Sequence, residues 1–153
     1  MSGAGAPKLE IDAIGLQVAI VVTSWHTEIT DGLLAGAERA LQAAGNTEYE
    51  IWRVPGAFEL PLGAQYAIDA GADVVIALGV VIQGDTPHFD YVCSAATDGL
   101  NRVQLDSGIP VGFGLLTVNT EQQALDRAGL PGSKEDKGAE AVEAAVLMAR
   151  LRA

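Results

Sequence analysis

The sequence has few of the features that mark secreted, membrane-spanning or nucleic-acid-binding proteins. It contains one cysteine, Cys93, which excludes an internal disulfide, and its apolar runs are far shorter than the roughly 20 residues of a membrane-spanning helix. Nine basic residues against 20 acidic ones give a formal net charge of −11, which argues against nucleic acid and anionic membranes as partners. A small anionic substrate is still compatible with this charge, because a few placed cations can bind one phosphate.

Motifs for nucleotide cofactors and metal ions are also missing. The sequence has no Gly-x-Gly-x-x-Gly, no Walker phosphate loop and no His and Cys at metal-binding spacing, so we expect neither a metal nor an organic cofactor. Residues 1–8 lack the basic-then-apolar layout of a signal peptide, from which we expect a cytoplasmic protein. We interpret residues 1–10 as a flexible N-terminal segment and residues 11–153 as one domain.

The remaining sequence alternates between apolar runs and helical patterns. Nearly continuous apolar runs, typical of parallel strands buried on both faces, predict strands at 16–22 and 74–82. Two more strands are predicted at 49–54, before a bend at Pro55 and Gly56, and at 111–118. Apolar residues at helical spacing and capping signals predict helices at 26–44, 58–70, 87–104, 120–128 and 136–152. This alternation predicts an α/β fold: a three-layer α/β/α sandwich with a flavodoxin-like parallel sheet of four strands in the order 2-1-3-4. A ligand would bind at the carboxyl ends of strands one and three, where the strand order reverses.

The stretch 77–90 changes from apolar to polar at Gly84 and holds the strongest catalytic candidate. Thr86 is predicted to cap a helix whose first residue is Pro87, and the free N–H groups of that helix suit a phosphate or another anion. A lone histidine is more often structural than catalytic. His88, however, follows a turn at a helix N-terminus, where the helix dipole disfavours its cationic form and leaves a neutral base near neutral pH. We therefore predict a catalytic role for His88.

Other candidates at the same sheet edge are open to two interpretations. Trp25 is either core filler or a ring that stacks on a heteroaromatic ligand, and Glu59 either stabilises its helix or binds an N–H-bearing ligand. We interpret His26 as structural, on the solvent side of the first turn of its helix, and Cys93 as a packing residue rather than a nucleophile. A phospho-receiver domain would share the fold but needs acidic residues after strand one, where residues 23–25 read Thr-Ser-Trp.

Several motifs, spaced in order along almost the whole chain, closely resemble the lumazine synthase (6,7-dimethyl-8-ribityllumazine synthase) family. The segments that carry this resemblance are 54–61 (Val-Pro-Gly-Ala-Phe-Glu-Leu-Pro), 77–82 (Ala-Leu-Gly-Val-Val-Ile), Gly84 with 86–93, 119–129 and 136–138 (Asp-Lys-Gly). The resemblance implies condensation of 5-amino-6-(D-ribitylamino)uracil with 3,4-dihydroxy-2-butanone 4-phosphate in riboflavin biosynthesis, without metal or cofactor. It also implies a site between the subunits of a pentamer.

Family roles carried over position by position fall into two sets. In the pyrimidine set, Trp25 would stack on the ring, Glu59 would face the ribityl hydroxyls, and strand three would line the pocket through its backbone. The implied pyrimidine-binding residues are Trp25, Ala57, Phe58, Glu59, Val80, Val81 and Ile82.

The second set would bind the phosphate and move protons. Asp85 and Thr86 would offer backbone N–H groups to the phosphate, assisted by Arg127, and His88 would shuttle protons. Phe113 matches a position that reaches a neighbouring subunit's site, and Lys137 matches a basic residue near the substrates.

Two departures from the family pattern concern the phosphate loop. Gln83 stands where many relatives carry arginine, and Asp85 stands where a neutral side chain is expected, which makes the loop less cationic. A non-catalytic lumazine or flavin binder and a shell-forming structural protein are therefore the alternatives to the enzyme. Arg127 and Lys137 are ten positions apart, a longer link than we expect in relatives that form 60-subunit shells, so we predict a homopentamer.

Overall fold

The computed structural model describes residues 4–7 and 9–152 and contains one parallel sheet. Its strands are β1 (Val18–Thr23), β2 (Glu50–Val54), β3 (Val74–Ile82) and β4 (Val111–Val118). They pair in the order β2-β1-β3-β4, all parallel, which confirms the predicted order 2-1-3-4. The switch point between β1 and β3, where ligands bind in such sheets, therefore lies in the middle of the sheet.

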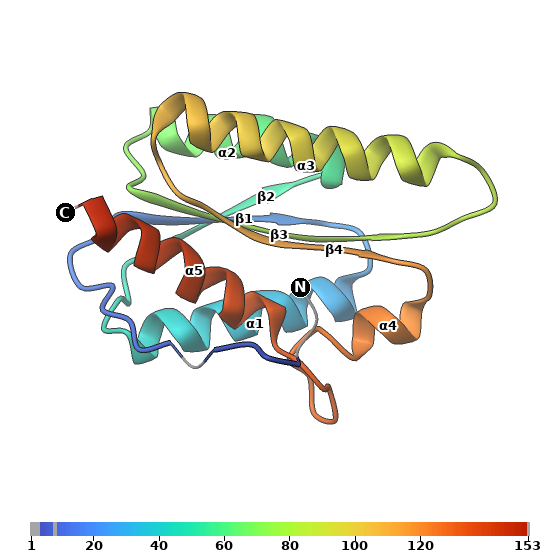
Figure 1. The fold of residues 1–153 in the computed structure, drawn as a ribbon, viewed down its shortest axis with the longest axis horizontal. Coiled ribbons are helices and arrows are strands. Elements are labelled where there is room, and N and C mark those ends of the chain that lie inside the picture. The colour runs from blue at the N-terminus through green and yellow to red at the C-terminus, as the bar shows by residue number, and fades with distance from the viewer. Residues whose placement is uncertain (1–3, 8, 153) are drawn as a thin grey trace.

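Helices cover both faces of the sheet, which confirms the three-layer sandwich (Figure 1). On one face lie α2 (Leu60–Asp69) and α3 (His88–Ser107). The other face carries α1 (Thr27–Ala43), α5 (Lys137–Arg152) and the short α4 (Glu121–Leu125). In the part of the chain that the structure describes, no helix is long and apolar enough to cross a membrane.

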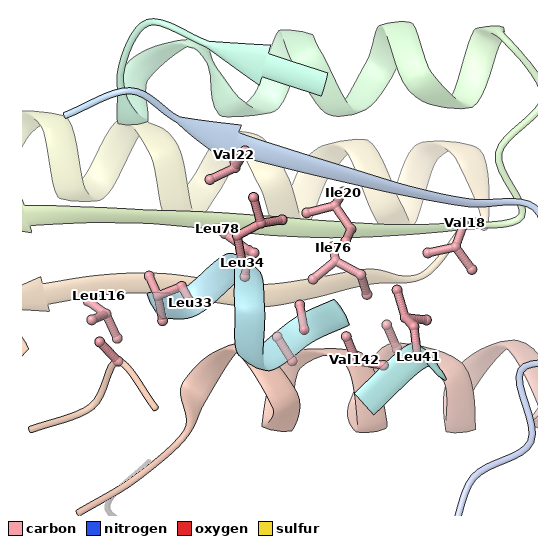
Figure 2. Close-up of a cluster of buried hydrophobic side chains, with 14 of the residues drawn as sticks. Val18, Ile20, Val22, Leu33, Leu34, Leu41, Ile76, Leu78, Leu116 and Val142 are labelled. Atoms are coloured by element: carbon pink, nitrogen blue, oxygen red, sulfur yellow. The ribbon is translucent and has the colours of Figure 1, made fainter. Parts of the chain in front are cut away.

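The sheet separates two apolar cores because successive strand side chains point to opposite faces. Val18, Ile20 and Val22 of β1 face α1 and α5, whereas Ala19 and Val21 face α2 and α3. Figure 2 shows the larger core, in which side chains of α1 interleave with those of β1 and β3. Burial on both faces explains why these strands read as continuous apolar runs.

Two predicted element boundaries need correction at the edge where ligands are expected. The predicted helix 58–70 begins with a 3₁₀ turn, Ala57–Glu59, before α2 starts. Glu59 bends back to accept a hydrogen bond from the Gly56 N–H, and Pro61 has no N–H to donate to a preceding turn. α3 begins at His88, one residue later than predicted, so the N-cap is Pro87 and not Thr86. The Thr86 hydroxyl still accepts a long hydrogen bond (3.4 Å) from the His88 N–H.

The other differences lie at the ends of elements. β1 starts two residues later than predicted, and α4 stops at Leu125 instead of residue 128. α3 extends to Ser107 and is followed by the cap residue Gly108 at φ 72°. The predicted capping box of α4 is present, with Thr120 and Gln123 bonded to each other's backbone N–H. Part of the predicted flexible segment, residues 1–3 and 8, lies outside the described residues.

Candidate functional site

A cavity of about 620 Å³ opens at the carboxyl edge of the sheet, beside the switch point. This volume lies within the roughly 300–1,000 Å³ of small-molecule sites. Its walls come from the end of β3, the segment after β1, the 3₁₀ turn before α2 and the first turn of α3. Eight residues that the sequence predicted for the site line this cavity: Trp25, Ala57, Phe58, Glu59, Val80, Val81, Ile82 and His88.

Trp25 forms one wall, and its indole is 65% exposed, so it is not core filler. The preceding residue fixes this wall, because the Ser24 hydroxyl donates to the Val54 carbonyl (2.9 Å) and the Ser24 N–H to the Pro55 carbonyl (3.2 Å). A Cβ at Gly56 would lie 3.3 Å from Trp25 Nε1, tighter than ordinary contact. The absence of a side chain at Gly56 therefore lets the indole lie against the backbone of the opposite wall.

Glu59 is held by a hydrogen bond within its own turn and also lines the cavity. Its Oε1 accepts a hydrogen bond of 2.9 Å from the Gly56 N–H, which holds the carboxylate in one orientation. The half-buried side chain also lines the cavity. A carboxylate fixed in this way can accept hydrogen bonds from a ligand without first losing rotamer freedom.

The loop between β3 and α3 brings His88 to the cavity and carries two free backbone donors. His88 is exposed and is the first residue of α3. Asp85 and Thr86 are exposed in this loop and do not line the cavity itself. Within residues 4–7 and 9–152, neither of their backbone N–H groups donates a hydrogen bond. These two donors are thus available to an anion next to His88.

Three predicted site residues lie away from this cavity in the single chain. Phe113, on β4, lines a separate depression of about 290 Å³ against α3. Arg127 and Lys137 follow α4 and begin α5, on the opposite face of the sheet from α2 and α3 (Figure 1). The two are tied together, since the Lys137 N–H donates to the Arg127 carbonyl (3.0 Å).

Comparison with known proteins decides the family. A family model described as 6,7-dimethyl-8-ribityllumazine synthase matches residues 15–153. Proteins of that name from Kineococcus radiotolerans and Leifsonia xyli are 63% and 62% identical, over 95% and 97% of this chain and 91% and 95% of theirs. One from Streptomyces coelicolor is 55% identical over 97% of this chain and 93% of its own. The chain belongs to the 6,7-dimethyl-8-ribityllumazine synthase family.

Sequence reasoning missed three cavity residues of this lumazine synthase family member: His26, Tyr91 and Val92. His26 was interpreted as structural, on the solvent side of the first turn of its helix, but it precedes α1 and lines the cavity, with its ring centroid 6.4 Å from that of Trp25. Among the described residues it is the only non-glycine with positive φ, at 54°. Tyr91 also lines the cavity. Its i+3 spacing from His88 could have revealed it, because such residues share one helix face.

Neither a reactive cysteine nor a metal-binding cluster is found among the described residues. Cys93 is half-buried in α3, and burial, reinforced by the nearby Asp90 carboxylate, raises the pKa of its thiol. A raised pKa lowers the thiolate fraction, which favours the packing interpretation. In the described part of the chain, no group of three His, Cys, Asp or Glu side chains is placed to bind a metal ion.

Proposed function

We propose that this chain catalyses the condensation of 5-amino-6-(D-ribitylamino)uracil with 3,4-dihydroxy-2-butanone 4-phosphate to 6,7-dimethyl-8-ribityllumazine, phosphate and water. The observation that carries the proposal is the single cavity that gathers an exposed indole, a fixed carboxylate and an imidazole, in a member of the lumazine synthase family. The reaction belongs to riboflavin biosynthesis, and the protein acts in the cytoplasm.

The wall formed by Trp25 and the 3₁₀ turn binds the pyrimidine. The flat ring stacks on the indole, and the strand backbone at 80–82 and the turn at 57–58 supply donors and acceptors to its polar edge. Glu59 accepts hydrogen bonds from the ribityl hydroxyls. Holding two substrates in one cavity raises their effective molarity, which contributes a larger part of the rate than proton transfer does.

His88 moves the protons that the three chemical stages require. Imine formation joins the 5-amino nitrogen to the ketone carbon and releases water. Elimination takes a carbon-bound proton and releases phosphate. Ring closure joins the ribityl-bearing nitrogen to the second carbonyl carbon, whose oxygen leaves as a second water. The exposed imidazole at the cavity wall reaches each of these protons in turn.

The phosphate requires cations that the cavity of one copy lacks. The lining contains Glu59 and two histidines but no lysine or arginine. The backbone N–H groups of Asp85 and Thr86 hold part of the phosphate charge, and Arg127 and Lys137 of a neighbouring copy complete the site, together with its Phe113. The exposed apolar rings at the cavity support such a neighbour, because Trp25, Phe58 and Tyr91 are 65%, 64% and 74% exposed in the single chain. The assembly is a homopentamer.

An assay with both substrates separates the enzyme from its main alternative, a non-catalytic lumazine or flavin binder. The purified protein should form the fluorescent lumazine product and release inorganic phosphate. Binding of lumazine or riboflavin without phosphate release would overturn the enzymatic proposal.

Mixed oligomers test the shared site. His88→Ala removes the imidazole from the cavity of its own copy, and Arg127→Gln removes the guanidinium that each copy gives to its neighbour's site. Each variant alone should therefore lose most activity. When equal amounts are co-assembled at random, about a quarter of the sites combine an intact cavity with an intact neighbour, and activity should rise toward about a quarter of the wild-type value. No rise above the mean of the two separate variants would show that all these residues act within one copy.

A further inference from the structure

Glu135 lies between the two basic residues that the proposed function assigns to the phosphate. Its Oε2 is 3.4 Å from Lys137 Nζ and 3.8 Å from Arg127 Nε. This oxygen is buried and, among the described residues, accepts no hydrogen bond, so both contacts are charge pairs without hydrogen-bond geometry. Glu135 Oε2 is therefore shared by two cations and forms a hydrogen bond with neither.

The backbone fixes Glu135 in this position. Its N–H donates to the Asp126 carbonyl (2.9 Å), and its carbonyl accepts from the Gly129 N–H (3.0 Å). The side chain is 15% exposed, as is that of Lys137, whereas that of Arg127 is 38% exposed. The carboxylate is thus a permanent neighbour of the pair and not a mobile surface group.

Each cation has a second anchor that does not involve Glu135. Arg127 Nη1 donates to the Gln123 carbonyl (2.8 Å), and Lys137 Nζ donates to Glu140 Oε1 (3.3 Å). Loss of the Glu135 charge would therefore leave both cations held in place. What would change is the local charge, which would become more positive by one unit.

We propose that Glu135 is a positioning residue that sets the charge of the Arg127–Lys137 pair and weakens its hold on phosphate. Inorganic phosphate is a product of the reaction, and the two cations would retain this anion more strongly without the Glu135 carboxylate, since among the described residues only Lys137 would keep a carboxylate partner, Glu140. The shared carboxylate competes with phosphate for both cations, so the product leaves more readily. The inference rests on the proposed role of Arg127 and Lys137.

The neutral variant Glu135→Gln tests it, with inorganic phosphate as a product inhibitor of the assembled enzyme. The inhibition constant for phosphate and the KM for the phosphate substrate should both fall about three- to tenfold, while the KM for the pyrimidine stays within about twofold. The effect should shrink in high salt, as a charge effect does. Glu135→Asp, which keeps the charge, should stay close to the wild type. If the amide disturbs assembly, Glu135→Ala gives the same readout.

Glu143→Gln is the matched control, because it removes a half-buried carboxylate of α5 that pairs with neither cation, and it should leave phosphate inhibition unchanged. An unchanged or raised inhibition constant in assembled Glu135→Gln would overturn the inference. Arg127→Gln in the same assay tells the two proposals apart. If Arg127→Gln does not weaken phosphate binding, the proposed role of Arg127 and Lys137 is wrong. If Arg127→Gln weakens phosphate binding but Glu135→Gln leaves it unchanged, only the inference about Glu135 is wrong.

Discussion

At the scale of single residues, the proposed function assigns the proton transfers to His88 and the positioning of the substrates to the rest of the cavity. His88→Ala should therefore slow phosphate release by roughly 10²- to 10⁴-fold without abolishing it, since the substrates are still held together. His26→Asn is a matched control that removes the other imidazole of the cavity and keeps a residue type that tolerates positive φ. We expect it to cost less than His88→Ala. Complete loss of activity in a His88→Ala protein that still forms pentamers would contradict the view that substrate positioning contributes most of the rate.

Asp85 places a negative side chain in the loop that should receive phosphate. Its side chain is exposed, so its cost is screened, but it still repels an approaching dianion. Asp85→Ala should lower the KM for the phosphate substrate about two- to fivefold, measured by steady-state kinetics. Glu48→Ala, an exposed carboxylate before β2, should leave that KM as it is. An unchanged or raised KM in Asp85→Ala would show that the Asp85 carboxylate does not weaken binding of the phosphate substrate.

Sequence reasoning found the cavity residues that directly follow a predicted strand. It missed the residues whose position depends on local backbone conformation. Trp25 and the 57–59 turn follow β1 and β2, so the order of the strands was enough to bring them together. His26 was missed because its place depends on a left-handed backbone at one residue, which periodicity does not report. Glu135 was missed because its charge pairs arise from the folding of the α4–α5 link.

At the scale of elements, α1 and α5 approach each other closely through glycine. A Cβ on Gly138, in the first turn of α5, would overlap the Leu33 carbonyl of α1, and one on Gly36 would overlap the Asp136 carboxylate. Gly138→Ala should therefore destabilise the protein by about 1–3 kcal/mol or more, measured as a lower unfolding midpoint. Gly84→Ala is the control, because no atom lies within 4 Å of the added Cβ. An unfolding midpoint unchanged by Gly138→Ala would mean that the helices can separate at little cost.

The elements themselves were largely predictable, and the errors have physical causes. β3 and β4 were predicted to the residue. β3 is a continuous apolar run buried along most of its length, whereas β4 is an edge strand in which Phe113 and Thr117 are exposed. The start of α2 was wrong because the Glu59 carboxylate and Pro61 favour a 3₁₀ turn there. α4 was predicted too long because residues 126–128 leave the helix to form the link that pairs Ala128 with Asp136.

At the scale of the whole molecule, the predicted site residues form two groups that one chain does not bring together. The cavity group lies at the carboxyl edge of the sheet, and neither Arg127 nor Lys137 lines that cavity, which requires a neighbouring copy if both groups act on one substrate pair. Light scattering should report a particle of about five chains. A particle of about 60 chains would show that the longer link before α5 does not prevent shell formation, and a monomer with full activity would contradict the shared site.

The loop between β3 and α3 offers the backbone N–H groups of Asp85 and Thr86 as donors, and this has a consequence for how the gene can change over time. Every residue except proline carries the same N–H group, so the side chains at 83 and 85 can drift under selection without removing a donor. What selection must preserve instead is the length of the loop and its path between β3 and His88. Insertions or deletions here should be far rarer among functional variants than substitutions at positions 83 and 85.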